Sequence, residues 1–184
     1  AADVYKRQMH NEECALHIKR YHHNPRYLSS VGFQPGRIHI YTDVNAAVAQ
    51  VDIVIFAVPS AFVKEVLEGM AEGALAGKLV CSTIKVIIPD ENMIVGEYLR
   101  EVVGVPEENI VVITGPCHAE EIAMERLSFL TVAAIEKAMA ARVAGVLKNH
   151  YMRCTLSTDI YGTEYAAVMK NVYAIVAGMY HGLG

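Results

Sequence analysis

Two lysines in this sequence stand in apolar surroundings, where an amine is unusual. Lys170, followed by Asn171, interrupts a long run of alanine, valine, isoleucine and methionine that covers every side of a helical wheel. Lys85 follows the apolar segment KLVCSTI and is itself followed by further apolar residues. If both amines face one cleft, each lowers the pKa of the other, and burial of Lys170 lowers its pKa further. An amine whose pKa is lowered in this way can act as a general acid or base.

Simpler roles for the same residues stay open. On spacing alone, Lys85 is a surface lysine that extends from a strand end to water. Asn171 could bond to backbone within a helical bundle instead of orienting the amine or a substrate hydroxyl. Lys170 is harder to explain, because a helix that is apolar all round predicts burial and gives its amine few routes to solvent. Lys170 is therefore the stronger candidate for a general acid or base.

Short apolar segments alternate with helix-like segments and must position these residues. The strand-like segments are RIHIY, DIVIFAV, KLVCSTI, NIVVITG, LTVAAI and MRCTLST. Two of them, DIVIFAV and NIVVITG, are apolar on both faces, as expected of parallel strands covered by helices on each side. The alternation predicts an α/β fold with a doubly wound parallel sheet over residues 1–158. The long apolar helix that follows predicts the start of a separate helical domain at residues 159–184.

Unusual residues follow three of these strands, at the edge where open α/β sheets bind ligands. The second strand ends in Val58-Pro59-Ser60, the third at Lys85, and the fourth in the turn GPCHA that starts at Gly115. Each can also be explained as an ordinary turn between a strand and a helix. Three of them on one sheet edge favour a binding site, in which the small residues let backbone approach a ligand.

The composition indicates a globular protein and argues against several classes. The chain has 184 residues, of which 53% are hydrophobic and 20% charged, and its net charge is -4. The densest basic stretch, HIKRYHHNPRY, is short and reads as a solvated loop, so we expect no nucleic-acid partner. His22 and His23 could bind a metal, but no second group of ligands accompanies them, and we expect no metal.

The cysteines and the apolar runs indicate the compartment. Four cysteines lie far apart without a CxxC pair, which fits neither a zinc site nor a disulfide scaffold and favours a reducing environment. No uninterrupted apolar run reaches the ~20 residues that span a bilayer, and the N-terminus lacks the apolar core of a signal peptide. We therefore expect a cytoplasmic protein with no membrane insertion.

Several motifs resemble those of bacterial-type NAD(P)-dependent glycerol-3-phosphate dehydrogenases. They are VDIVIFAVPSAFV, CSTIK, ITGPCHAEEIA and YGTEYAAVMKNVYAIVAGMYHGLG, and the similarity extends from about residue 10 to the end of the chain. The resemblance implies a Rossmann-type domain and hydride transfer between NAD(P)H and dihydroxyacetone phosphate. The product, sn-glycerol 3-phosphate, serves phospholipid synthesis in this family. NAD or NADP would be the cofactor, and the parent enzyme would be a homodimer.

The resemblance also implies roles for individual residues. Lys170 matches the proton donor, and Lys85 matches a lysine that touches both substrate and nicotinamide. Further substrate contacts are implied or expected at Gly115, Cys117 and Asn171, with Cys117 standing where serine or threonine is usual. Implied cofactor contacts are at His10, Phe62, Lys85 and Ala119.

The sequence also departs from the family pattern. It has no GxGxxG turn, and Val86 stands where glycine usually follows the strand-end lysine. The opening residues AADVYKRQ do not match the family's second strand, which leaves their origin open. The family's aspartate and arginine–asparagine pair would follow Gly184. We expect the middle part of an enzyme, inactive and self-associating in isolation.

Two alternatives stay open beside this function. A related two-domain reductase of another small keto or hydroxy acid would share the sheet and the lysine–asparagine pair. A non-catalytic fragment that binds a partner or a nucleotide is the alternative outside the enzymes, and the lack of a glycine-rich turn favours it.

Overall fold

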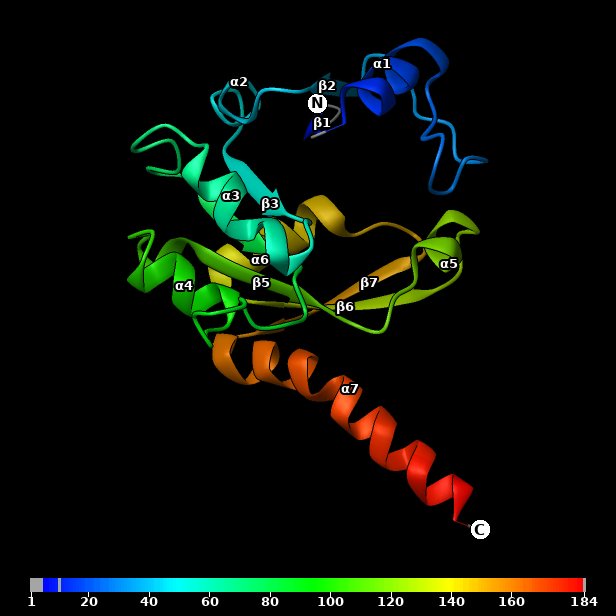
Figure 1. Cartoon of the computed structure of the whole chain (residues 1–184), viewed down its shortest axis with the longest axis vertical. Helices are drawn as coiled ribbons and strands as arrows, with labels where there is room; N and C mark the ends of the chain where they lie inside the picture. The colour runs from blue at the N-terminus through cyan, green and yellow to red at the C-terminus, as the bar shows by residue number, and fades with distance from the viewer. Residues whose placement is uncertain (1–4, 10, 184) are drawn as a thin grey trace.

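Two sheets form the framework of the chain (Figure 1). The computed structural model describes residues 5–9 and 11–183, so the cofactor contact expected at His10 lies outside the described residues. A two-stranded sheet pairs β1 with β2, and a five-stranded sheet has the order β3-β4-β5-β6-β7. The strands are β1 (Tyr5–Gln8), β2 (Ile38–Tyr41), β3 (Ile53–Phe56), β4 (Leu79–Ser82), β5 (Ile110–Thr114), β6 (Ser128–Ala133) and β7 (Met152–Ser157).

Helices connect these strands in the predicted alternation. Most are short, and only α7 runs for 23 residues. The helices are α1 (Glu12–Tyr21), α2 (Val44–Val48), α3 (Val63–Glu68), α4 (Val95–Glu101), α5 (Ala119–Ala123), α6 (Lys137–Leu147) and α7 (Ile160–Gly182), with 3-10 turns η1 (Ser60–Phe62) and η2 (Glu107–Asn109). Among the described helices, none combines the length and the hydropathy that crossing a membrane would require.

The central sheet is doubly wound, as predicted, but it is not parallel throughout. β3, β4 and β5 are parallel, whereas β6 pairs with β5 in the antiparallel sense and β7 then runs parallel to β6. Residues 115–127 join β5 to β6 and contain only the five-residue α5. A parallel return would need a longer crossover that carries the chain back along the sheet, so this connection turns at the edge.

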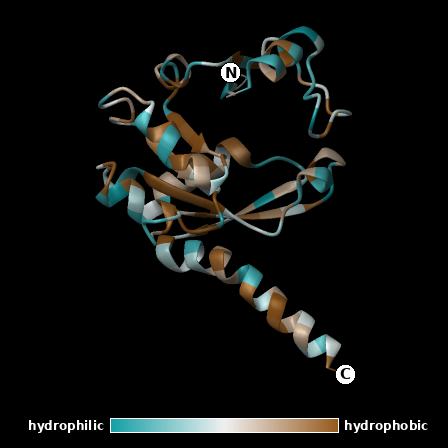
Figure 2. Ribbon diagram, viewed as in Figure 1, coloured by the Kyte–Doolittle hydropathy of each residue, from teal (hydrophilic) through white to brown (hydrophobic). Residues whose placement is uncertain are grey.

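Both faces of β4 and β5 are covered, as the two-sided apolar pattern of NIVVITG predicted, whereas the edge strand β3 leaves Ile55 39% exposed. On one face, Val80 and Ile110 pack in a cluster that includes Leu99 of α4. On the other face, Cys81 and Val111 pack in a cluster with residues of α6. Figure 2 shows the resulting concentration of hydrophobic residues along these strands. The carboxyl ends of β3, β4 and β5 are therefore held at one edge by a core on each side.

The N-terminal part corrects two expectations. Tyr5–Gln8 is a strand that pairs in register with β2, although its sequence YKRQ is polar; its side chains alternate between exposed and half-buried, which suits an edge strand. The first half of HIKRYHHNPRY is not a loop but the end of α1. Asn11 caps this helix by accepting from the Cys14 amide at 2.8 Å, and His22 ends it with a left-handed backbone.

Helix α7 contradicts the expectation of burial on all sides. Its first turns pack below the sheet beside α4, and the rest extends away from the body (Figure 1). Every residue from Met169 to Leu183 is exposed, including the large apolar side chains Val172, Tyr173 and Ile175. These turns therefore leave a large apolar surface exposed. The division of the chain at residues 158/159 falls just before this helix and stays a prediction.

Candidate functional site

The ends of β4 and β5 bring two predicted site residues together. The Lys85 amine, which is half-buried, donates to the carbonyl oxygen of Gly115 with a Nζ–O distance of 3.3 Å. The same carbonyl accepts from the Cys117 amide at 3.0 Å. One oxygen therefore ties together three of the residues expected at the substrate. Lys85 spans two neighbouring strand ends, so its amine lies at the sheet edge where ligands bind in this class of fold.

Gly115 has a geometry that a side chain would not allow. Its backbone φ is +151°, and a Cβ atom there would lie 2.3 Å from the carbonyl oxygen of Phe129. The strand after the turn approaches the glycine this closely because β6 folds straight back onto β5. The glycine is therefore required by the chain reversal, whatever it also offers to a ligand.

The expected cofactor contacts that the structure describes lie on two other connections. Phe62 ends the turn η1 after β3, and its ring is 53% exposed. Ala119 begins α5 and lines a hollow of about 350 Å³ with Leu28, Val31 and Tyr151. Both residues are accessible to a ligand. Val86, which replaces the usual glycine, is also exposed.

Lys170 and Asn171 are not brought to the Lys85 amine by any contact of the described chain. Both side chains are exposed, and within the described residues neither takes part in a hydrogen bond or an ion pair. The burial predicted for Lys170 is therefore wrong for this chain. Its physical reason is that no described element packs against the helix beyond its first turns.

A carboxylate that the sequence interpretation overlooked is buried on the same helix. Glu164 is only 1% exposed, and both its oxygens accept from the Gly96 amide, at 3.2 and 3.1 Å. Burial raises the pKa of Glu164 to about 7, against the opposing effect of the Gly96 and Val95 amides. Glu164 lies one turn after the buried Ile160 and so on the face of α7 that meets the body.

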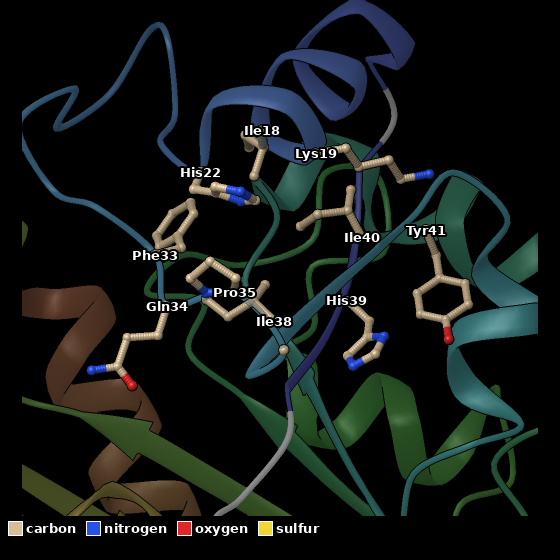
Figure 3. Close-up of a pocket in the computed structure, with 11 residues that line it drawn as sticks. Ile18, Lys19, His22, Phe33, Gln34, Pro35, Ile38, His39, Ile40 and Tyr41 are labelled. Atoms are coloured by element: carbon tan, nitrogen blue, oxygen red, sulfur yellow. The ribbon is translucent and has the colours of Figure 1, made fainter.

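A hollow in the N-terminal part is lined by residues other than those of this sheet edge (Figure 3). It has a volume of about 400 Å³ and is lined by α1, the loop after it and β2. Ile18, Phe33 and Ile38 form its apolar wall, and His22 projects from the end of α1. Among the described residues, none of those predicted for catalysis or for cofactor contact lies in its wall.

The histidines near α1 contact each other in a pair other than the one the sequence suggested. The Nε2 atoms of His17 and His23 lie 3.4 Å apart, whereas His22 turns to the hollow of Figure 3. Within residues 5–9 and 11–183, no three His, Cys, Asp or Glu side chains gather as a metal site would require.

Comparison with known proteins relates most of the chain to a family of enzymes. The family model described as NAD-dependent glycerol-3-phosphate dehydrogenase N-terminus matches residues 4–140. Glycerol-3-phosphate dehydrogenase (NAD(P)+) of Ectopseudomonas mendocina is 35% identical over 176 residues, covering 96% of this chain and 51% of that protein. The corresponding protein of Latilactobacillus sakei is 32% identical, with coverage of 94% and 52%. The chain spans about half the length of the curated relatives it matches.

Solved structures of enzymes with the same name share the fold of this chain. Glycerol-3-phosphate dehydrogenase of Plasmodium falciparum matches with a TM-score of 0.85 and 21% identity, covering 98% of this chain and 51% of that one. The enzyme of Saccharomyces cerevisiae matches with a TM-score of 0.82 and 22% identity, covering 98% and 55%. The family match begins at residue 4, so β1 lies within the matched segment.

Proposed function

Because the chain belongs to the family of NAD-dependent glycerol-3-phosphate dehydrogenase N-terminal domains, we propose that it is part of an oxidoreductase acting on dihydroxyacetone phosphate. The enzyme would transfer a hydride between NAD(P)H and this substrate to give sn-glycerol 3-phosphate for phospholipid synthesis. The chain would contribute most of the cofactor domain and the first helix of the substrate domain.

The contact between Lys85 and Gly115 carries this proposal. It supports a ligand site because it holds an amine at the carboxyl ends of β4 and β5, in a sheet whose two faces are closed by packed helices. An ammonium group at this edge suits an anionic substrate and an oxygen that gains negative charge. A substrate oxygen could replace the carbonyl of Gly115 as the acceptor for Lys85.

Two lysines would share the chemistry at the substrate carbonyl. The nicotinamide supplies or accepts the hydride when the cofactor is bound. Lys170 would deliver a proton to the carbonyl oxygen, and Lys85 would stabilise the negative charge that develops there. Cys117 would line the substrate loop, and Asn171 would orient the Lys170 amine or a substrate hydroxyl.

The described residues fit one part of a dinucleotide better than the rest. Phe62 is exposed and Ala119 lines a hollow, so both are accessible to a nicotinamide. The sequence contains no GxGxxG turn to donate amides to a pyrophosphate. These residues would therefore hold the nicotinamide end, and they leave the choice between NAD and NADP open.

The compartment and the assembly of the enzyme are further proposals. We propose a cytoplasmic location, because the four cysteines are all free thiols in the structure. Burial raises the pKa of the Cys81 thiol to about 12, which keeps it in the unreactive protonated form. A homodimer is proposed by resemblance to the family.

A substitution at each end of β4 tests the function. Lys85 follows this strand, and Lys78 precedes it and donates to the Val51 carbonyl at 2.7 Å, so the two lysines are matched in their contacts. In a complete enzyme that joins this chain to the segments its relatives carry, Lys85→Met should lower turnover of dihydroxyacetone phosphate by roughly 10²-fold. Lys78→Met should leave turnover nearly unchanged.

Substrate choice is tested with the same complete enzyme. NAD(P)H oxidation should be much faster with dihydroxyacetone phosphate than with a panel of small keto acids. Preference for a keto acid would support the related reductase instead. Equal effects of the two lysine substitutions on turnover would show that Lys85 is not part of the site.

A further inference from the structure

One buried charged residue links α7 to the rest of the chain. Glu164 is the only charged side chain among the described residues that is more than nine-tenths buried. Its two oxygens both accept from the amide of Gly96, in the first turn of α4. A buried carboxylate is costly unless its hydrogen bonds are satisfied, so this contact constrains how the two helices meet.

The contact with Glu164 supplies the N-terminal cap that α4 lacks. The residue that precedes this helix is Ile94, which has no side chain able to accept from the first amides. Glu164 provides that acceptor from another helix. Gly96 in turn makes room for it, because a Cβ atom at this position would lie 2.8 Å from Oε2 of Glu164. The carboxylate and the glycine therefore fit each other as a pair.

Two other contacts anchor the first turns of α7 nearby. Ile160 packs with Val112 of β5 and Ala133 of β6. The Tyr161 hydroxyl donates to Glu107 at 2.8 Å, and the same carboxylate accepts from Arg100 of α4 at 3.2 Å. The anchored residues thus lie within the first five positions of the helix, on the side of the sheet and α4.

The remainder of α7 has no such support within the described chain. Lys170 lies six residues beyond Glu164, which is roughly 9 Å along a helix axis. A tilt of about 10° at the anchor would move Lys170 by roughly 1.5 Å at that distance. Displacements of about 1 Å at a catalytic group can cost on the order of 10²-fold in rate. The direction set at the anchor therefore matters for chemistry farther along the helix.

We propose that Glu164 is a positioning residue, which caps α4 from outside and thereby fixes the direction of α7 and the place of Lys170. The structural part of this proposal is the pairing of Glu164 with Gly96. The part that concerns turnover rests on the proposed function.

The experiment uses the complete enzyme with three variants, Glu164→Ala, Gly96→Ala and the double variant. We expect each single variant to lower kcat by about 10- to 100-fold while the KM for NAD(P)H changes little. The double variant should be no worse than either single one, because both remove the same contact and Glu164→Ala relieves the clash at residue 96. Hydrogen exchange of the first α4 amides should be at least about tenfold faster in all three.

Controls separate positioning from general destabilisation. Glu72→Ala removes an exposed glutamate and should change neither kcat nor exchange. Glu164→Gln keeps one acceptor for the Gly96 amide. It should therefore retain most of the exchange protection and turnover that Glu164→Ala loses, and it serves as the test if Glu164→Ala folds poorly. Additive losses in the double variant, or unchanged exchange in α4, would overturn the pairing. If the unaltered enzyme has no turnover, the proposed function fails while the exchange data still decide on the pairing.

Discussion

The two parts of α7 differ in almost every physical respect although one apolar sequence continues through both. The first turns place Ile160 in the core and Glu164 against Gly96, with both side chains nearly inaccessible. The later turns, from Met169 onward, are exposed on all sides. Lys170, the residue with the strongest claim to chemistry, belongs to the second part. Its position therefore depends on a helix that only the first part holds in place.

The difference shows what an apolar pattern can and cannot predict. A helix that is apolar all round predicts that its surface becomes covered, but it does not identify the covering element. Figure 2 shows hydrophobic residues continuing along α7 where no described element meets it. A lone charged residue in such a helix likewise has two outcomes, since Glu164 is buried and Lys170 is exposed.

Substitutions of aliphatic residues in the two regions should give the largest contrast in stability. Leu99→Ala removes a fully buried side chain of α4 and should lower the free energy of unfolding by about 2–5 kcal/mol. Ile175→Ala removes a side chain that is 63% exposed and should change it by less than about 0.5 kcal/mol. Urea unfolding of the chain measures both. A comparable loss in the two variants would show that α7 is covered in solution, for example by a second copy.

Lys170→Met tests the chemistry of the exposed part. Methionine suits an apolar helix, so the fold of the complete enzyme should be kept. Its kcat should fall by roughly 10²-fold or more, the range for loss of a general acid. Lys137→Met, at the exposed start of α6, is the matched control. Near-normal turnover of the Lys170 variant would show that this residue is an ordinary surface lysine and not the general acid.

The anchored part should respond to pH through Glu164. Its pKa is raised to about 7, so between pH 4.5 and 7 the folded chain holds a proton that the unfolded chain releases. The stability of the folded state should therefore be greatest at the acidic end and fall as pH rises, by on the order of 2 kcal/mol. The charged group that acts on this carboxylate is Glu97, which raises its pKa further, while Arg100, Glu107 and Tyr161 bond to one another between α4 and the first turn of α7.

The corresponding measurement is urea unfolding of the chain at pH 5 and pH 7.5. Glu164→Gln should flatten the difference between the two values, whereas Glu72→Gln should preserve it. A slope that is the same in both variants would assign the pH dependence to other groups.

Cys117→Ser should have the smallest effect. Serine is the more usual residue at this position in the family, and the amide contact with Gly115 does not involve the side chain. We expect the KM for dihydroxyacetone phosphate to change by less than roughly threefold in the complete enzyme. Substrate should also slow alkylation of Cys117 in the unaltered protein. Equal alkylation with and without substrate would place the thiol outside the site.

Much of the framework could be predicted because the strands carry strong local patterns. DIVIFAV and NIVVITG are apolar on both faces, and both form strands. β5 lies between two helical layers, whereas β3 leaves Ile55 39% exposed. The strand YKRQ could not be recognised in this way, because its pairing with β2 and not its composition makes it a strand. The reversal of β6 was also missed, since the alternation of strands and helices does not reveal strand direction.

The candidate site was predictable where it follows from strand order alone. Lys85 and Gly115 stand directly after neighbouring parallel strands, so the fold places them at one edge. Glu164 escaped notice because its partner is a backbone amide 68 residues away, and an amide leaves no mark in the sequence. Gly96 was the available signal, as a glycine near the start of a helix that has no polar cap.

The antiparallel pairing of β5 with β6 has a consequence for the order in which the chain folds. Only residues 115–127 separate these strands, whereas residues 57–78 separate β3 from β4 and residues 83–109 separate β4 from β5. A shorter loop loses less entropy on closing, so β5 and β6 should pair before the parallel strands assemble. Val132→Ala in β6 should then slow folding, and Val54→Ala in β3 should mainly speed unfolding, as stopped-flow kinetics in urea would show. The reversal at Gly115, which brings the Lys85 acceptor to the sheet edge, would in that case also be the first long-range structure that the chain acquires.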